Sequence, residues 1–247
     1  MCTLALAVGA DRRWPLVVAA NRDERLGRPS EGWAIRDPAG AGPRYAAPRD
    51  LQAGGTWIGL SAASVFAGVT NYHASMAWYP DPARRSRGEL VALALAHPSA
   101  SAAREALSSL PAARYNPFHL AVADARSAFV WWYDGEAAGL EPLGAGLHVI
   151  TENAWDGRCP RAELVRARWP VEPALPRLRQ VLTIHGPALT FGASTCIHMD
   201  PAYGTRSSAV IRLAARLESS ELYTADGPPC TFLLEDRSAL LRGLAPG

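Results

Sequence analysis

Residues 2–24 decide the fold, and they read CTLALAVGADRRWPLVVAANRDE. Residues 2–8 and 15–20 are two short apolar runs with a Gly-containing turn between them, and this pattern predicts a β-hairpin. Four polar residues, Asn21-Arg22-Asp23-Glu24, follow directly at the end of the second strand. If the two strands pair, these polar residues lie beside the start of the chain.

Outward from this hairpin, strands and helices come in blocks. The pattern predicts strands over 56–60, 65–70, 119–123, 128–133, 147–151, 209–213, 221–224 and 231–235, and helices over 89–96, 102–110, 161–168 and 175–184. Ser86 and Ser101 are the expected caps of the first two helices. Residues 28–48 are rich in Pro, Gly and Arg, and we expect them to be irregular.

The order of these elements favours one fold class. No βαβ alternation occurs, which argues against a parallel doubly wound sheet. Blocks of hairpins separated by helix pairs predict an α+β fold, in which helices cover stacked antiparallel sheets. The sequence shows no internal repeat and no linker, so we expect a single domain over residues 1–247.

Composition excludes several function classes. The net charge of the 247 residues is +2, which argues against a nucleic-acid surface. The chain contains no lysine, so a lysine Schiff base and a P-loop lysine are excluded. The Ala-, Arg-, Gly- and Pro-rich composition is typical of a GC-rich bacterial coding background. No signal peptide and no apolar run of membrane-spanning length occurs, so we expect a cytoplasmic protein without a membrane span.

The four cysteines are Cys2, Cys159, Cys196 and Cys230. They form no CxxC pair and no Cys/His spacing typical of a zinc site, so we expect reduced thiols and no metal site.

Cys2 is the first candidate for chemistry. A penultimate cysteine is small enough for normal removal of Met1, which leaves a thiol and a free α-amine on one residue. The α-amine has an ordinary pKa of roughly 7.7–8.0, so it can act as the general base for its own thiol. The alternative is an inert cysteine at the start of a buried strand.

Other polar residues at strand ends could complete such a site. Asp23 could hold a protonated α-amine, and Arg22 could lower the thiol pKa, although both could also belong to a solvated loop. Asn71 and Asn153 each follow a predicted strand, where an amide N–H could bind an oxyanion or serve an ordinary turn. Arg206 precedes another strand and could point into a cleft or lie at its rim.

Read together, several segments resemble the NRDE family, also named the transport and Golgi organisation protein 2 family. The matching segments run in family order over most of the chain: Met1-Cys2-Thr3, Asn21-Arg22-Asp23-Glu24, Gly54-Gly55-Thr56-Trp57, Thr70-Asn71-Tyr72, Ser86-Arg87-Gly88-Glu89-Leu90, Tyr115-Asn116-Pro117-Phe118 and Tyr203-Gly204-Thr205-Arg206-Ser207-Ser208. Any one segment is weak evidence, and the ordered set is specific.

The resemblance implies a fold and a set of catalytic residues. The family resembles N-terminal-nucleophile hydrolases, whose fold is a four-layer αββα sandwich. By similarity to cysteine acylases, Cys2 is the nucleophile, Asp23 binds its amine, and Asn71 is the oxyanion residue. Asn153 and Arg206 match the remaining catalytic positions more loosely, while the acylase arginine falls on Ala20, so Arg22 is the candidate to replace it.

Two functions follow. The first is hydrolysis of a non-peptide amide C–N bond, or of a thioester, in a small acyl substrate. Its predicted binding residues are Asn21, Arg22, Trp57, Tyr72 and His73, and Trp78 and Tyr79 could extend an acyl pocket or pack in the core. This function needs no cofactor.

The alternative is a protein that binds or traffics haem or a lipid-like acyl ligand in the same cleft without turnover. Cys2, His73 and His119 are the candidate iron ligands. Cys159-Pro160 also resembles a Cys-Pro haem-binding motif, but a proline at the first position of a helix is the better explanation of Pro160. A third possibility is a purely structural role for an inactive hydrolase scaffold.

Overall fold

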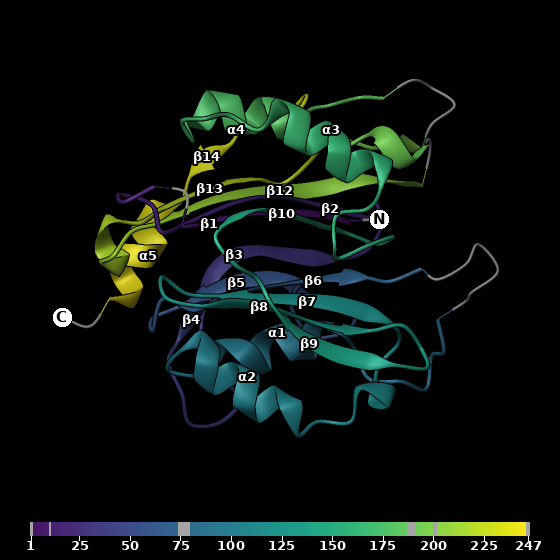
Figure 1. Ribbon diagram of the computed structural model, residues 1–247, viewed down its shortest axis with the longest axis vertical. Helices are drawn as coiled ribbons and strands as arrows, with labels where there is room; N and C mark the ends of the chain where they lie inside the picture. Colours follow the sequence, from purple (N-terminus) through teal and green to yellow (C-terminus); the bar gives the residue numbers. More distant parts are fainter. Residues whose placement is uncertain (1, 10, 74–79, 187–190, 200–201, 246–247) are drawn as a thin grey trace.

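Two antiparallel sheets of seven strands each face one another in the computed structural model of the chain (Figure 1). The structure describes residues 2–9, 11–73, 80–186, 191–199 and 202–245. One helix pair covers the outer face of each sheet, so the layers follow the order helix, sheet, sheet, helix. This is the predicted four-layer αββα sandwich, and the fold class is confirmed.

Sheet A contains the N-terminal hairpin. Its strand order is β10-β1-β2-β12-β13-β14, and β11 pairs with β12. The strands are β1 (Cys2–Val8), β2 (Leu16–Arg25), β10 (Gly146–Thr151), β11 (His198–Met199), β12 (Tyr203–Leu213), β13 (Glu221–Ala225) and β14 (Glu235–Asp236). The hairpin prediction is confirmed, because β1 and β2 pair from Cys2 opposite Arg22 to Val8 opposite Leu16.

Sheet B follows the chain order without a crossover, β3-β4-β5-β6-β7-β8-β9. Its strands are β3 (Ser30–Arg36), β4 (Tyr45–Asp50), β5 (Ile58–Ser61), β6 (Phe66–Asn71), β7 (Phe118–Ala123), β8 (Ala128–Tyr133) and β9 (Ala138–Pro142).

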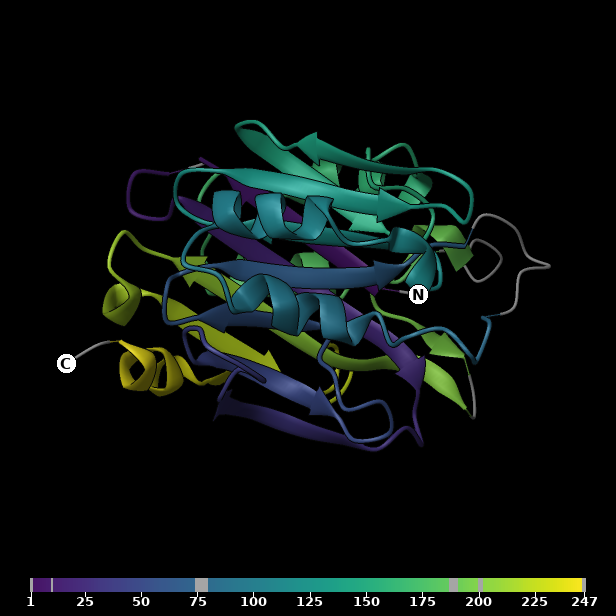
Figure 2. The same ribbon diagram turned by 90° about the horizontal axis from the view of Figure 1, so that it is seen from below.

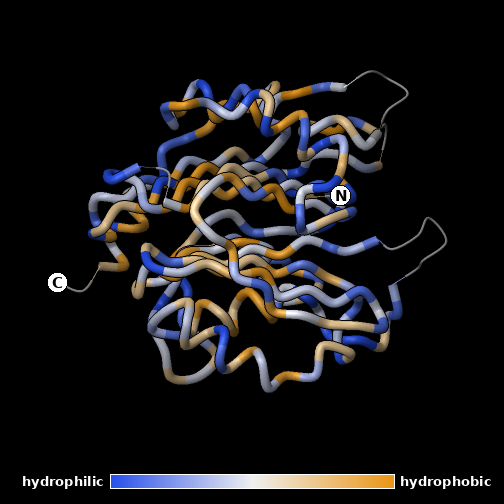
Figure 3. The backbone as a smooth tube through the Cα atoms, in the orientation of Figure 1, coloured by the Kyte–Doolittle hydropathy of each residue, from blue (hydrophilic) through white to orange (hydrophobic). Residues whose placement is uncertain are grey.

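The side chains of each strand alternate between two hydrophobic layers. On β1, Leu4 and Leu6 pack between the sheets with Ile58 and Phe66 of sheet B, whereas Ala5 and Ala7 face the helices that cover sheet A. Strands that are buried on both faces read as continuous apolar runs, which explains the composition of residues 2–8. Figure 3 shows the hydrophobic residues concentrated along the inner layers.

The helices are α1 (Gly88–Leu95), α2 (Ala100–Ser108), α3 (Pro160–Arg168), α4 (Leu175–Leu182) and α5 (Ser238–Leu244), with short 3-10 turns at Ala112–Arg114, Phe191–Ala193 and Leu217–Ser219. α1 and α2 lie across the outer face of sheet B (Figure 2), α3 and α4 cover sheet A, and α5 packs against β3, β4 and β13. Within the described residues, no helix has the length and apolar character that a bilayer span requires.

Some local predictions are wrong. The segment over 28–48 is not irregular throughout, because it contains β3 and β4, which lie at one edge of sheet B where Pro and Arg are tolerated. The side chain of Ser99, not Ser101, caps α2. At α1 the N-cap position is Arg87, which makes no side-chain cap bond, while Ser86 Oγ accepts a hydrogen bond of 3.3 Å from the amide of Gly88 at the start of the helix. β9 and α5 were not predicted, and the predicted strand over 231–235 is reduced to β14.

Candidate active site

Cys2 and Arg22 lie directly opposite one another on β1 and β2. Cys2 shares its face of the sheet with Leu4 and Leu6, and it is 9% exposed. Arg22 is 7% exposed and stands on the same face as Ala20, where its guanidinium lies 3.6 Å from Glu24 and 3.7 Å from Asp50. The side chain of Arg22 therefore points to the region of the thiol and not to bulk solvent.

Asp23 lies one residue beyond this pair on β2, and the positive charge of the chain's N-terminus lowers its carboxyl pKa. It is buried, and its Oδ1 accepts a hydrogen bond of 2.6 Å from Thr205 on β12. Its backbone carbonyl accepts hydrogen bonds from the Tyr203 hydroxyl at 3.0 Å and from the Cys2 thiol at 4.0 Å. Its Oδ2 is buried and has no hydrogen-bond partner in the described part of the chain.

The electrostatics of the two groups follow from this burial. Burial raises the pKa of the Asp23 carboxyl to about 7. Burial also raises the pKa of the Cys2 thiol, and the Asp23 carboxylate adds to this effect while Arg22 opposes it. A buried thiol of raised pKa needs a nearby base to become a nucleophile. The Asp23 carboxyl feels the positive charges of the chain's N-terminus and of Arg161, which lower its pKa against the effect of burial, so it is suited to hold an ammonium group.

A buried ion pair supports the same strand end. Arg161 on α3 donates two hydrogen bonds to Glu152, at 2.7 and 3.2 Å, and a longer one of 3.5 Å to the backbone carbonyl of Cys2. Arg161 is 0% exposed and Glu152 is 2% exposed. The Glu152 carbonyl also accepts from the backbone of His73, so the pair ties α3, β10 and the segment after β6 to the start of β1.

A cavity of about 1270 Å³ opens beside Cys2, where β2 and β6 end and α1 begins. Its lining includes Cys2, Arg22, Asp23, Trp57, Asn71 and Arg87. The structure thus brings six residues from five separate sequence segments to one cavity, and five of the six were predicted from the sequence.

Arg87 is the one of these six cavity residues that was not predicted from the sequence as a site residue. It immediately precedes α1, and its Nη1 donates to the Pro117 carbonyl at 3.1 Å. Burial lowers the pKa of Arg87 to about 10, whereas the Cys2 thiolate and Glu24 raise it. The Ser86–Leu90 segment, which contributes to the family resemblance, could have indicated Arg87. Strand pairing in the N-terminal hairpin does not place this segment near Cys2.

Several predicted site residues do not line this cavity. Asn21 is 0% exposed. Its side-chain amide donates hydrogen bonds to the carbonyls of Leu182 and Thr195 and accepts one from the Ser208 hydroxyl, so it joins sheet A to the α4 region. Arg206 forms an ion pair of 2.8 Å with the exposed Asp226, because a bulge between Thr205 and Ser207 interrupts the strand there.

Three predicted site residues after β6 and β10, Tyr72, His73 and Asn153, do not line the cavity either. Asn153 is exposed in the turn after β10, where its amide donates to Glu152 at 3.3 Å. Tyr72 packs on the ring of His119, with centroids 4.8 Å apart, and His73 is exposed. Trp78 and Tyr79 lie outside the described residues.

The candidate iron ligands differ in access. His119 is 2% exposed, Nδ1 lies 2.9 Å from the Thr151 carbonyl, and burial lowers its pKa to about 4. Cys159 is buried at the N-cap of α3, and Pro160 occupies the start of that helix as expected. Of the candidate ligands in the described chain, Cys2 alone lines the cavity.

Two stacked antiparallel sheets between helix pairs, with a cysteine at the start of a central strand, define the N-terminal-nucleophile hydrolase fold. Solved structures with this fold include an N-acylethanolamine-hydrolyzing acid amidase orthologue from Caenorhabditis elegans, with a TM-score of 0.61 and 15% identity over 85% of this chain and 92% of that chain. Penicillin V acylase from Agrobacterium tumefaciens has a TM-score of 0.55 and 16% identity over 97% and 88%. A variant of the conjugated bile acid hydrolase from Clostridium perfringens has a TM-score of 0.55 and 10% identity over 97% and 93%.

Sequence comparison places the chain in a family within this fold. The profile of Transport and Golgi organisation 2 matches residues 1–170, and the chain belongs to this family. The Bos taurus Transport and Golgi organization protein 2 homolog is 30% identical over 236 residues, and the Homo sapiens homolog is 28% identical over 235. Each match covers 81% of this chain and 82% of the relative. The family resemblance predicted from the motifs is confirmed.

Proposed function

We propose that the chain is an N-terminal cysteine hydrolase that cleaves the amide C–N bond of a small acyl substrate. One observation carries the proposal: the buried Asp23, whose Oδ2 has no hydrogen-bond partner among the described residues, follows the residue opposite Cys2, and the positive charge of the chain's N-terminus lowers its carboxyl pKa. A neutral α-amine freed at Cys2 would become a cation when it takes up the thiol proton, and the Asp23 carboxylate would stabilise that cation on the same residue as the thiolate.

The chemistry divides into two steps. The α-amine of Cys2 takes the thiol proton while Sγ attacks the substrate carbonyl carbon, which gives a tetrahedral oxyanion. The amine then returns the proton to the leaving nitrogen as the C–N bond breaks, and an acyl thioester of Cys2 remains. Water, deprotonated by the same α-amine, then attacks the thioester carbonyl. The C–S bond breaks, the carboxylic acid leaves, and the amine returns the proton to Sγ. A thioester substrate would follow the same path with a thiol as the leaving group.

The cavity walls provide the binding groups for this reaction. Asn71, at the end of β6, is the side-chain donor for the oxyanion, because an amide N–H stabilises negative charge without adding a net charge to the site. Arg22 and Arg87 lie on the cavity wall and favour a substrate with a polar or anionic group beside the scissile bond. Trp57 offers an apolar surface for the acyl chain.

The fold neighbours support the reaction class. The three solved proteins are an acid amidase, an acylase and a conjugated bile acid hydrolase, and all of them act on acyl compounds of low molecular weight. Their likeness to this chain concerns the fold, so the substrate is a prediction from the cavity and not from these proteins.

A panel of fatty acyl amides with a chromogenic amine leaving group tests the proposal. We expect turnover by the purified wild-type protein and by the Cys159→Ala variant, which replaces a buried cysteine outside the cavity. Cys2→Ala should be inactive, and Cys2→Ser should be strongly impaired. Full activity in Cys2→Ala would refute the proposal, and so would the absence of turnover on amides and thioesters by a protein that starts at Cys2.

The second candidate is retention of an apolar ligand, such as haem or a long acyl chain, without turnover. The observation that favours it is the size of the cavity together with Phe232 and Leu233, which line it yet are 49% and 74% exposed. Titration with hemin separates the two candidates. A Soret shift that is lost in Cys2→Ala supports haem ligation by the thiol, and an unchanged hemin spectrum counts against it.

A further inference from the structure

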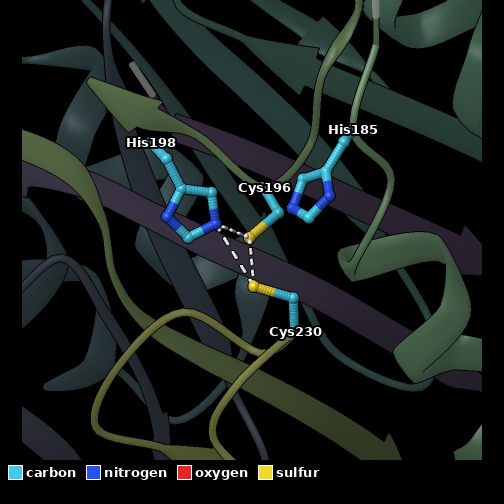
Figure 4. Close-up of side chains that lie close together, drawn as sticks. All are labelled: His185, Cys196, His198 and Cys230. Carbon is cyan, nitrogen blue, oxygen red and sulfur yellow. Dashed lines mark hydrogen bonds between the residues drawn. The ribbon is translucent and has the colours of Figure 1, made fainter. Parts of the chain in front are cut away.

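Four side chains with soft or borderline ligand atoms meet on the outer side of sheet A, away from the cavity. They are His185, Cys196, His198 and Cys230, and their ligand atoms all lie within 4.8 Å of one another. Figure 4 shows the two imidazole rings and the two thiols converging on a common point. No residue of this cluster lines the cavity beside Cys2.

The distances within the cluster match a tetrahedral metal site. The Cys196 and Cys230 sulfurs are 3.6 Å apart, and Nε2 of His198 lies 3.4 Å from the first and 3.2 Å from the second. Zinc–sulfur bonds of about 2.3 Å and zinc–nitrogen bonds of about 2.0 Å at tetrahedral angles require separations of about 3.8 Å between sulfurs and about 3.5 Å between sulfur and nitrogen. Three vertices are therefore already in place.

His185 supplies the fourth vertex. Its ring packs edge-on against that of His198, with centroids 5.2 Å apart. His185 is exposed, so a small rotation of the ring brings a nitrogen into the ligand position without disturbing the core.

The backbone holds these ligands in position independently of any ion. The amides of Thr195 and Cys196 both donate to the Ile184 carbonyl, and the Thr195 hydroxyl donates to Val181 at 2.6 Å. His198 lies on β11, opposite Gly204 of β12. Ligands on fixed backbone lose little entropy when they bind an ion, which favours a built site.

We propose that His185, Cys196, His198 and Cys230 bind one Zn²⁺ ion in a structural His₂Cys₂ site. Two thiolates and two imidazoles are the donor set that selects zinc among the divalent metals, and a site with four protein ligands leaves no open position for substrate. Binding displaces the two thiol protons to solvent and forms two Zn–S and two Zn–N bonds.

Linear spacing could not reveal this site. The cysteines form no zinc-type spacing along the chain, so the sequence predicted no metal site. In the structure Cys230, in the turn after β13, lies beside Cys196, which is 34 residues earlier in the chain. Only the pairing of β12 with β11 and β13 brings the two segments together.

The site would also stabilise the support of Asp23. The amide of Ile197 donates to the Thr205 hydroxyl at 2.8 Å, and that hydroxyl donates to Asp23. A zinc ion that fixes residues 196 and 198 would therefore fix the partner that orients the carboxylate. This consequence rests on the proposed function, but the metal site itself does not.

Metal analysis of the full-length protein tests the proposal. We expect elemental analysis to give about one zinc per chain. Replacement by Co²⁺ should give the visible bands of tetrahedral cobalt with a thiolate charge-transfer band, and X-ray absorption should give two sulfur and two nitrogen ligands. Zinc should be lost in the Cys196→Ser/Cys230→Ser double variant and in His198→Ala, and retained in the controls Cys159→Ser and His97→Ala.

Defined results would overturn the proposal. These are wild-type protein that takes up neither zinc nor cobalt, a ligand set without sulfur, or an undiminished zinc content in the double variant. A protein mass lower by two hydrogens, with Cys196 and Cys230 unreactive to thiol reagents until reduced, would identify a disulfide in place of the metal site. Because the cobalt and X-ray absorption readouts use the wild-type chain, poor folding of a variant leaves the test intact, and loss of hydrolase activity alone would bear only on the proposed function.

Discussion

Two cysteine-containing regions of sheet A differ in what surrounds the thiol. Cys2 is a single thiol beside a buried carboxylate, an arginine and a large cavity. Cys196 and Cys230 are a pair of thiols beside two imidazoles, and neither thiol belongs to a residue that lines the cavity beside Cys2. The groups around a cysteine, and not the residue type alone, therefore decide whether its thiol is suited to nucleophilic attack or to metal binding.

The two regions are nevertheless coupled through one side chain. Thr205 accepts from Ile197, which lies between two of the proposed zinc ligands, and donates to Asp23. Changes on the Cys2 side should therefore alter activity without removing zinc, whereas loss of zinc should weaken the support of Asp23.

The largest expected effect is on the Cys2 side. Cys2→Ala should lower turnover of an acyl amide by at least about 10³-fold, because the attacking atom is lost. Zinc content should stay unchanged, as measured by elemental analysis on the same preparation. If the zinc content falls with the activity, the two regions are not separable as we describe them.

The buried ion pair beneath Cys2 should dominate local stability. Glu152→Gln leaves Arg161 buried with an uncompensated charge, and we expect the free energy of unfolding to fall by about 3–5 kcal/mol in urea titrations. The matched control is Asp226→Asn, which breaks the Arg206 pair at a side chain that is 75% exposed. This control should cost less than about 1 kcal/mol. Equal losses of unfolding free energy in the two variants would contradict the claim that the buried Glu152–Arg161 pair dominates local stability.

Asn71 should affect the rate and not the fold. Asn71→Ala removes the proposed oxyanion donor, so we expect kcat to fall by about 10²–10³-fold with little change in KM. Asn153→Ala provides the contrast, because Asn153 is exposed and lies outside the cavity lining. A larger loss in Asn153→Ala than in Asn71→Ala would exchange their roles.

A further prediction concerns the pH dependence of stability. The pKa of Asp23 is raised from its ordinary value of 3.8 to about 7, so the folded state keeps a proton that the unfolded state releases. The resulting contribution is present below pH 3.8 and is lost as the pH rises through about 7, at no more than about 1.4 kcal/mol per pH unit. The free energy of unfolding of Asp23→Asn, measured from pH 4 to 8, should lack this slope.

Removal of Met1 gives the same prediction a second test. The N-terminal ammonium already lowers the carboxyl pKa of Asp23, and we expect a larger lowering when removal of Met1 places that charge on Cys2, because an opposite charge favours the charged form. The slope should therefore be smaller in protein that starts at Cys2 than in protein that retains Met1. Equal slopes in the two forms would place the amine away from Asp23.

The fold could be predicted because its strands are apolar runs broken by clear turns. Residues 2–8 and 15–20 fixed the hairpin, and its pairing brought Asp23 beside Cys2. β3 and β4 were not predicted because their Pro, Gly and Arg residues otherwise indicate a loop. β3 is the edge strand of sheet B, and Pro48 of β4 lies beyond the two residues, Tyr45 and Ala46, that pair with β5. α5 escaped because it is short and follows a turn-rich segment.

The site was predictable only where strand pairing determines proximity. Arg206 was placed from its motif, but the bulge beside it turns the side chain towards Asp226. Glu152 and Arg161 were missed because their contact depends on how α3 packs against β10, which no local pattern reports. The four-residue cluster around Cys196 was missed for the same reason.

The most direct test of the central claim is the intact mass of the protein, before and during turnover of an acyl amide. We predict a chain without Met1 that gains the mass of one acyl group, located on Cys2 by peptide mapping and absent from Cys2→Ala. A chain that retains Met1 and stays unmodified while substrate is consumed would contradict the account.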